Sequence, residues 1–175
     1  MTMPPAPSNP RLRIRRARQE DVPLILGFIK ELAEYERLAH EVVANEAILR
    51  ETLFGERPYA EVVIAYYDGQ PVGYAIFFHS FSSFLGRPGI YLEDVYVRPP
   101  MREKGIGKAL LVYLAQLAKE RKCGRLEWAV LNWNEPSRAF YKKLGAMPMS
   151  EWTVYRLTGT ALDRVAEDAQ HPPTT

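Results

Sequence analysis

A glycine-containing loop in the second half of the chain has the residue types of an anion site. In the segment RPPMREKGIGKALL, Arg102, Gly105 and Gly107 form an Arg-x-x-Gly-x-Gly pattern at the start of an amphipathic stretch. The first amides of a helix have no helical partner, glycines let a ligand approach the backbone, and the helix dipole favours negative charge. Lys104 and Lys108 add positive charge, so the loop predicts a site for phosphate oxygens.

Two familiar phosphate motifs do not match this loop. A Walker A loop would need a glycine where Arg102 stands and a serine or threonine where Ala109 stands. A dinucleotide fingerprint would need a small residue at Leu110 and a loop directly after the strand, whereas seven residues separate Val97 from Gly105. A pyrophosphate held by backbone amides without magnesium ligands remains. The alternative is that the glycines only permit a tight turn into a helix.

Alternating strands and helices must position this loop. Apolar residues at every second position predict strands, and a 3.6-residue apolar period predicts helices. The expected strands are Leu12–Ala17, Ala60–Tyr67, Pro71–His79, Ile90–Val97, Leu126–Leu131 and Trp152–Leu157, with a loop between His79 and Ile90. The expected helices are a first one opening at Pro23 and reaching Tyr35, a second capped by Asn45 and ending at Leu53, then Gly105–Lys122 and Pro136–Leu144. This order fits an α/β fold with a mixed sheet and helices on both faces.

Composition bounds the class of protein. The 175 residues carry 23 basic and 21 acidic side chains, a formal charge of +2, and 47% hydrophobic residues. The one cysteine, Cys123, excludes an internal disulfide and a cysteine-based zinc cluster. No apolar stretch is long enough for a membrane span or a signal peptide, so we expect a cytoplasmic protein without a membrane partner. Proline-rich ends predict disordered segments at residues 1–10 and 168–175 around one domain, residues 11–167.

Charge is distributed unevenly along this domain. Residues 20–61 carry a formal charge of −6 and residues 98–125 one of +6. The first half could therefore hold a cation and the second half an anion, although two ordinary solvated helix faces would give the same pattern. The basic segment lacks interleaved exposed aromatics, so we expect no nucleic-acid partner.

Three segments resemble one family. Tyr91–Leu111 (YLEDVYVRPPMREKGIGKALL), Leu126–Ala146 (LEWAVLNWNEPSRAFYKKLGA) and Ile29–Leu38 (IKELAEYERL) resemble the GNAT superfamily of N-acetyltransferases. Their details are similar to the diamine branch, of spermidine/spermine type or thialysine type. The resemblance implies an acyl-CoA N-acyltransferase fold whose central sheet splays between its fourth and fifth strands. It also implies acetyl-CoA as cosubstrate and a homodimer with the last strand exchanged between subunits.

Amide formation from acetyl-CoA sets three chemical requirements. The amine must be neutral, the thioester carbonyl polarised and the departing thiolate protonated. A tyrosine, with a pKa of about 10 against about 8.5 for a thiol, suits the last role, and the resemblance assigns it to Tyr141; a core aromatic beside Phe140 is the alternative. Glu93 is the candidate base, acting through a water, or else a substrate anchor. Glu93 and Asp94 are adjacent, so they face opposite sides of a regular strand unless a bulge redirects one.

The resemblance also assigns contacts with acetyl-CoA. Backbone amides around Val95 and Val97 would hold the acetyl carbonyl and the pantetheine. The full set implied is Val95, Tyr96, Val97, Arg102, Glu103, Lys104, Gly105, Ile106, Gly107, Lys108, Ala109, Asn134, Ser137, Tyr141 and Lys143. Simple capping of a helix is the alternative for Asn134 and Ser137, and a solvated side chain for Lys143.

The acceptor amine is less defined by sequence. Cationic nitrogens need carboxylates, and the expected substrate residues are Glu31, Glu93, Asp94, Ser82 and Phe84. The spermidine-type pattern has an aspartate, proline and tryptophan where Ser82, Ser83 and Phe84 stand here, which favours a shorter amine or a lysine-like amino acid.

We therefore expect acetyl transfer to a small cationic amine by direct attack in a ternary complex. The alternatives are a peptide or protein lysine acetyltransferase and a non-catalytic acyl-CoA sensor. His40 and His79 lack the spacing of metal ligands, and no metal is expected.

Overall fold

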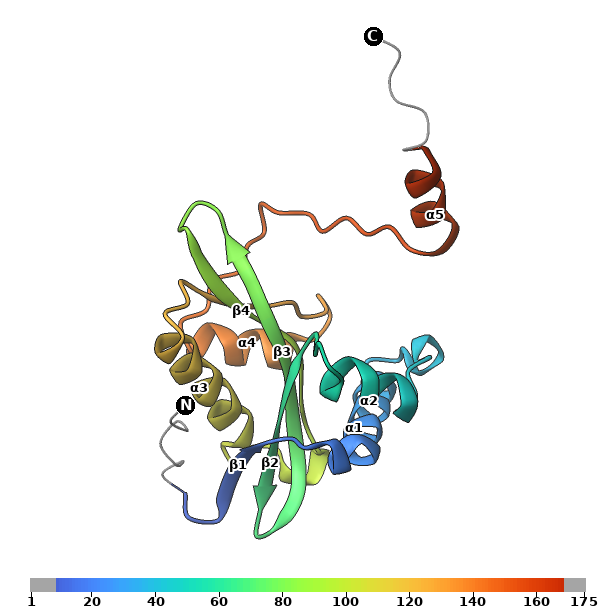
Figure 1. The fold of residues 1–175 in the computed structure, drawn as a ribbon. Coiled ribbons are helices and arrows are strands. Elements are labelled where there is room, and N and C mark those ends of the chain that lie inside the picture. The colour runs from blue at the N-terminus through green and yellow to red at the C-terminus, as the bar shows by residue number, and fades with distance from the viewer. Residues whose placement is uncertain (1–8, 169–175) are drawn as a thin grey trace. The chain divides into compact units, whose positions relative to one another are not determined.

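A computed structural model describes residues 9–168 (Figure 1). The chain divides into two compact units, one ending at Ala129 and the other beginning at Val130. The strands are β1 (Leu12–Arg16), β2 (Glu61–Tyr67), β3 (Gln70–Ser82), β4 (Arg87–Val97) and β5 (Leu126–Trp128). The α-helices are α1 (Val22–Tyr35), α2 (Glu46–Phe54), α3 (Ile106–Glu120), α4 (Glu135–Lys143) and α5 (Gly159–Asp168), and the 3-10 helices are Gln19–Asp21, Ala39–Glu41 and Pro99–Met101.

The first unit contains a five-stranded mixed sheet, as the sequence predicted. Its strand order is β1-β2-β3-β4-β5, and β4 and β5 are parallel while the other neighbours are antiparallel. The pairing of β4 with β5 stops at Leu92 and Trp128, although β4 continues to Val97. β4 therefore continues beyond the end of its pairing with β5, and its residues 93–97 have no β5 partner in the described chain.

Helices cover both faces of this sheet (Figure 1). Alternate strand residues point to opposite faces, so apolar side chains are buried on each. On one face, α1 and α2 bury a cluster with strand residues from β2, β3 and β4; its buried members are Val22, Ile25, Phe28, Leu49, Val62, Ile64, Tyr74, Ile76 and Tyr96. The intervening strand residues, such as Val63, Ala75 and Phe77, are also buried and face α3. The buried stripe of α3 consists of Ile106, Leu110, Leu111, Tyr113, Leu114, Leu117 and Ala118.

Local signals in the sequence set several boundaries. Pro23 lies in the first turn of α1, where its missing N–H costs nothing. The Asn45 side chain accepts a hydrogen bond from the Ile48 amide at 3.0 Å and caps α2, as predicted. Asp68 and Gly69, with φ of 50° and 79°, form the tight turn between β2 and β3.

Several elements differ from the predictions by more than a residue or two at their ends. The expected loop after His79 is mostly hairpin, since β3 continues to Ser82 and β4 begins at Arg87. The fifth strand ends at Trp128 rather than Leu131. The predicted strand Trp152–Leu157 is wrong for the described chain: it forms no ladder there, because an extended segment becomes a strand only when another strand supplies its hydrogen-bond partners. Helix α5 follows instead and was not predicted.

The predictions for the chain ends fall mostly outside the described residues. Residues 1–8 and 169–175 are not described. Asn9 and Pro10 enter a turn in which the Leu12 amide donates to the Asn9 carbonyl at 3.0 Å, and Asp168 belongs to α5. Within residues 9–168, no helix is long and apolar enough to cross a membrane.

Candidate active site

The glycine loop has an unusual backbone path into α3. After the 3-10 helix Pro99–Met101, Glu103 and Gly105 both adopt left-handed conformations, with φ of 64° and 77°. Gly105 is the residue immediately before α3, and in the described chain no side chain caps this terminus. The first helical bond runs from the Ala109 amide to the Gly105 carbonyl, 2.9 Å away. The amides before Ala109 therefore point out of the helix end, where an anion can accept from them.

The two glycines leave open space at this helix end. A Cβ built on Gly105 would meet nothing within 4 Å, and one on Gly107 would meet only the Val97 Cγ2, 4.0 Å away. Internal packing therefore does not demand glycine at either position; Gly105 is needed for its left-handed φ. An open helix end with Lys104 before it and Lys108 in the first turn of α3 favours phosphate oxygens.

Arg102 connects this loop to α1. Its Nε donates to the Val97 carbonyl at 3.1 Å, and its guanidinium lies 4.5 Å from the centre of the Tyr35 ring. The side chain is exposed in this position. Arg102 therefore lies between the glycine loop and the end of α1.

β4 presents a second set of free donors, at the edge that β5 leaves. The Arg98 amide donates to the Val72 carbonyl at 2.9 Å, which is a bond toward the β3 side. Because amides alternate between the two edges of a strand, those of Val95 and Val97 point to the opposite edge. In the described chain β5 pairs with β4 only as far as Leu92, so residues 93–97 form an open edge of β4. The Tyr96 side chain is buried in the core, so only its backbone is available at this edge.

A β-bulge lies at the start of this open edge. Asp94 pairs with Ile76 and Leu92 with Phe77, which leaves Glu93 as the extra residue on β4. Bulges redirect side chains and are common beside active sites. The Glu93 side chain is exposed, whereas Asp94 is half-buried on the sheet face that α1 covers. The bulge is the exception to strict alternation that the sequence left open.

Asp94 lies in an acidic, partly buried environment. The Tyr74 hydroxyl donates to its Oδ2 at 2.9 Å. Burial raises the pKa of Asp94, and the charge of Glu93 raises it further, while the bond from Tyr74 acts in the opposite direction. Burial also raises the pKa of Glu36 at the end of α1, with the charge of Asp94 as the second cause. Asp94 and Glu36 therefore repel each other, and a cation between them would relieve that repulsion.

Glu31, the other expected carboxylate of α1, already has a partner. Arg98 donates to both of its oxygens, with Nε–Oε2 and Nη2–Oε1 distances of 3.0 and 2.8 Å. Arg98 also donates to the Pro71 carbonyl at 3.0 Å and lies 4.8 Å from the centre of the Phe28 ring. The Glu31 carboxylate therefore fastens α1 to the end of β4.

The two predicted residues of the β3–β4 hairpin lie at its turn. The Ser82 hydroxyl is buried and accepts from the Leu85 amide at 3.3 Å, which closes the turn. Phe84 is 97% exposed at the tip, with Phe81 and Leu85 also exposed. The structure thus gives Ser82 a local role in the hairpin.

The remaining predicted residues belong to the second unit. Asn134 is buried and its side chain accepts from the Ser137 amide at 3.3 Å, so it caps α4. Tyr141 is half-buried with its ring 5.5 Å from that of Phe140, and Lys143 is exposed in the last turn of α4. The structure therefore brings together the glycine loop, the open edge and the bulge in one unit, and Asn134, Ser137 and Tyr141 in the other.

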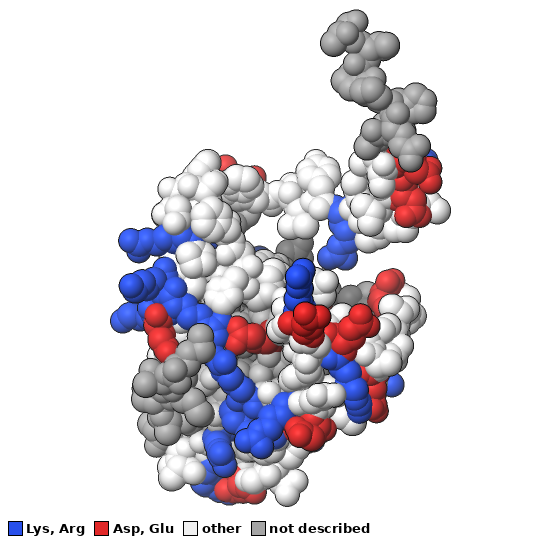
Figure 2. Space-filling view, viewed as in Figure 1, with Lys and Arg blue, Asp and Glu red and all other residues white. Residues whose placement is uncertain are grey.

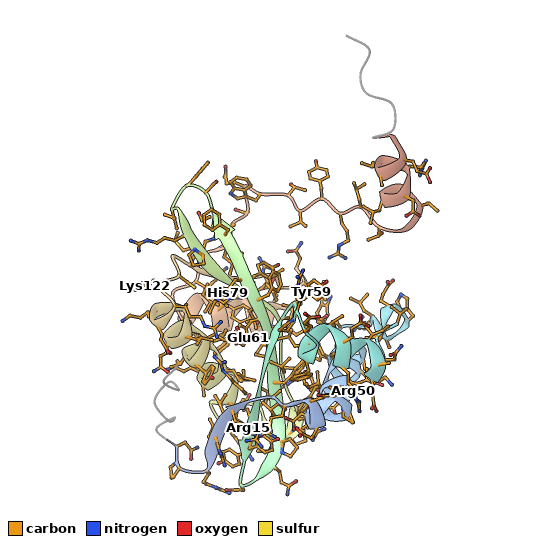
Figure 3. All side chains as sticks on the ribbon, in the orientation of Figure 1. Arg15, Arg50, Tyr59, Glu61, His79 and Lys122 are labelled. Atoms are coloured by element: carbon orange, nitrogen blue, oxygen red, sulfur yellow. The ribbon has the colours of Figure 1, made fainter. Side chains whose placement is uncertain are left out.

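Charged groups elsewhere in the first unit form structural pairs. His79 lies beside Glu61 on the sheet (Figure 3), and its Nε2 is 3.3 Å from Nη1 of Arg121, which binds both oxygens of Glu61. Basic side chains gather over the part of this unit where α3 lies (Figure 2). Within residues 9–168, no group of three or more His, Cys, Asp or Glu side chains could hold a metal ion.

Tyr74 was not among the predicted site residues, whereas Glu36 was one of four carboxylates, with Glu31, Glu34 and Glu93, that the sequence offers to a cationic amine. A tyrosine at an inward position of an apolar strand is the available signal for Tyr74, since a buried hydroxyl needs a partner. No pattern in the sequence shows that this partner is Asp94.

Similar proteins are known from both sequence and structure. The model of the acetyltransferase (GNAT) family matches residues 28–146. A thialysine N-epsilon-acetyltransferase of Bos taurus is 40% identical over 166 residues, covering 87% of this chain and 96% of that protein. An L-ornithine N5-acetyltransferase of Arabidopsis thaliana is 33% identical and covers 87% of both chains. An integron cassette protein from the mobile metagenome of V. cholerae has a solved structure with a TM-score of 0.77 and 27% identity, covering 91% of this chain and 99% of that chain.

Proposed function

This chain belongs to the acetyltransferase (GNAT) family and is an N-acetyltransferase, so we propose that it acetylates the primary amine of a small diamine, polyamine or lysine-like amino acid. The amine attacks acetyl-CoA directly in a ternary complex. One observation carries the proposal: an uncapped glycine-rich helix end, an open β4 edge and the bulged Glu93–Asp94 pair occur together in the first unit.

Acetyl-CoA is the cosubstrate that GNAT acetyltransferases use, and the first unit offers suitable donors. The amides at the start of α3, with Arg102, Lys104 and Lys108, would hold its phosphates. The amides of Val95 and Val97 would hold the pantetheine and polarise the acetyl carbonyl. The second unit would add Asn134, Ser137, Tyr141 and Lys143 to this set. Glu103 and Ile106 would contribute through their backbone, and Ala109 would contact the cosubstrate from the first turn of α3.

Proton transfers are assigned to two side chains. Bound acetyl-CoA supplies an acetyl group activated as a thioester. Glu93 accepts the proton that the ammonium of the substrate must lose, either directly or through a water, because an alkylammonium is no nucleophile. The Tyr141 hydroxyl donates a proton to the departing thiolate, since a phenol and a thiol are close in pKa.

The amine is proposed to bind between Asp94 and Glu36. Burial raises the pKa of both carboxyls, the charge of Glu93 raises that of Asp94 further, and the charge of Asp94 raises that of Glu36. A cationic amine would relieve these effects. Phe78 and Tyr91, whose ring centres are 5.2 Å apart on the same sheet face, offer an apolar wall for methylene groups. The relatives named for thialysine and L-ornithine support an amino acid with a terminal side-chain amine.

A homodimer with an exchanged C-terminal strand is part of the proposal. Trp152, Val154 and Tyr155 are 72%, 84% and 92% exposed, which is unusual for large apolar side chains. The segment has the alternation of a strand, and a second copy could supply its missing partner. We also propose one functional domain over residues 11–167, located in the cytoplasm, with no nucleic-acid or membrane partner.

The test is release of free CoA thiol by the purified chain. Acetyl-CoA is offered with thialysine, L-ornithine, L-lysine, putrescine, spermidine or a lysine peptide. A signal with one of the small amines supports the proposal, and a signal confined to the peptide would favour a protein acetyltransferase. Acetyl-CoA binding without any thiol release would favour a sensor.

Tyr141→Phe tests the proposed acid. We expect kcat to fall by about 100-fold, within the range for general acid catalysis, and acetyl-CoA affinity to stay within about twofold. Tyr59→Phe, a change at a tyrosine that is 79% exposed, is the matched control and should behave as the unchanged chain. Full turnover in Tyr141→Phe would remove Tyr141 from the mechanism.

A further inference from the structure

Tyr74 is a buried tyrosine whose hydroxyl reaches the face of the sheet where the amine is proposed to bind. Its side chain is fully buried, and its ring stacks on Phe28 of α1 with centres 5.2 Å apart and planes 6° apart. Arg98 lies on the Phe28 ring as well, 4.8 Å from its centre. The tyrosine ring is thus immobilised by packing, and its hydroxyl has one fixed direction, toward Asp94 Oδ2 at 2.9 Å.

The hydroxyl can act only as a donor to Asp94. Burial raises the pKa of Tyr74 well above its ordinary value, and the charges of Asp94 and Glu36 raise it further, so the phenol keeps its proton. An ionised carboxylate, in contrast, accepts hydrogen bonds and donates none. The pair therefore consists of a permanent donor on β3 and an acceptor on β4.

Asp94 needs this donor because its other neighbours disfavour its charge. Burial and the charge of Glu93 raise the pKa of Asp94, and the charge of Asp94 in turn raises the pKa of Glu36 at the end of α1. Tyr96, a second tyrosine of the same buried cluster, interacts with Glu31 instead, and burial and the charge of Glu31 raise its pKa. Within the described chain, the bond from Tyr74 is the interaction that favours the ionised form of Asp94.

We propose that Tyr74 is a positioning residue for acetyl transfer: its immobilised hydroxyl holds the Asp94 carboxylate in the place where it receives the cationic amine. The inference rests on the proposed function, because it needs Asp94 to bind substrate. Tyr74 touches neither the amine nor acetyl-CoA in this scheme. Its effect is on amine binding through Asp94 and not on the transfer step.

Tyr74→Phe in the full-length protein is the test, since it removes the hydroxyl and keeps the stack on Phe28. Hydrogen bonds to charged groups are strong enough that their loss changes an equilibrium by about tenfold. We expect the Asp94 carboxyl carbon, followed by NMR in 13C-labelled protein, to titrate about one pH unit higher than in the unchanged chain. The KM for the amine should rise about tenfold while kcat changes by less than about twofold.

Tyr113→Phe is the matched control, because Tyr113 is also buried, lies on α3 and has a hydroxyl without a hydrogen-bond partner among the described residues. It should leave both the Asp94 titration and the KM unchanged. Asp94→Asn and the double variant with Tyr74→Phe complete a cycle. Once Asp94 is neutral, removal of the Tyr74 hydroxyl should have no further effect on KM.

Two results would overturn the inference. One is an Asp94 titration in Tyr74→Phe that coincides with that of the unchanged chain. The other is a rise in KM of equal size whether or not Asp94 is present. Failure of the proposed function is distinguishable, since the unchanged chain would then release no thiol with thialysine, L-ornithine or spermidine; an active chain with an unaffected Tyr74→Phe variant refutes only the role of Tyr74.

Discussion

Alanine substitutions at the two glycines of the loop distinguish a requirement for a left-handed backbone from a requirement for space beside it. Gly105 has a φ of 77°, and a Cβ there would meet nothing within 4 Å. A residue with a Cβ in this left-handed conformation costs about 1–2 kcal/mol. Gly107, in contrast, lies in α3, and its added Cβ would be 4.0 Å from the nearest atom, Val97 Cγ2. Alanine there removes the entropic cost of glycine in a helix, up to about 1 kcal/mol.

The two variants should therefore differ in sign. Gly105→Ala should lower the melting temperature by about 2–8 °C at about 2–4 °C per kcal/mol, and Gly107→Ala should leave it equal or higher. If the loop of the free Gly105→Ala variant relaxes out of the left-handed region, the melting temperature falls by less. Acetyl-CoA binding must then restore that geometry, so up to about a 5–30-fold loss of affinity appears instead. Asparagine tolerates this conformation better, so Gly105→Asn should recover part of either loss.

Differential scanning calorimetry of the free protein and titration calorimetry with acetyl-CoA measure the two quantities. Their summed free-energy loss should be about 1–2 kcal/mol for Gly105→Ala. A Gly105→Ala variant that equals Gly107→Ala in both measurements would refute the conformational argument. A Gly105→Asn variant worse than Gly105→Ala would refute it as well.

Further predictions concern carboxylates of the first unit. Because the pKa of Asp94 is raised in the fold, the contribution of Asp94 to stability is greatest below the ordinary aspartate range and declines as pH rises through the folded value. Asp94→Asn should remove that decline in thermal melts from pH 3 to 7. At pH 7 the variant should therefore melt higher, by about 2–4 °C for each kcal/mol of stability gained. The hydrogen bonds from Arg15 lower the pKa of Asp21, so the contribution of Asp21 is present above its ordinary range and lost as pH falls through the folded value. In urea denaturation, Asp21→Asn should cost about 1–3 kcal/mol at pH 7, and this loss should disappear once the pH has fallen through the folded value. Glu31 is held by Arg98, so Glu31→Gln should change the KM for the amine less than Asp94→Asn does and cost less than about 1 kcal/mol of stability.

Most elements of the sheet followed from local patterns in the sequence. The strands of the first unit, the amphipathic α3 and the Asn45 cap are determined by the alternation, periodicity and capping of neighbouring residues. The glycine loop was also recognisable, since its pattern and charges are contiguous. The hairpin Ser82–Arg87 was not, because its strand character comes from pairing across the turn and not from its composition.

The strand predicted over Trp152–Leu157 also shows that pairing, and not composition alone, decides whether a segment becomes a strand. Its alternation is a strand pattern, yet the described chain gives it no hydrogen-bond partner. A sequence pattern can report that a segment suits an extended backbone. Whether a partner strand lies beside it depends on the rest of the chain or on a second copy.

The sequence by itself determined which residues could do chemistry: the glycines of the loop, Tyr141, and the Glu93–Asp94 pair. The tertiary structure decided how the carboxylates differ. The bulge leaves Glu93 exposed and unpaired in the register, Tyr74 binds Asp94 from the neighbouring strand, and Arg98 neutralises Glu31. These differences arise from register, burial and contacts between residues far apart in the chain, and such contacts set the charge and direction of a carboxylate more strongly than its neighbours in sequence do.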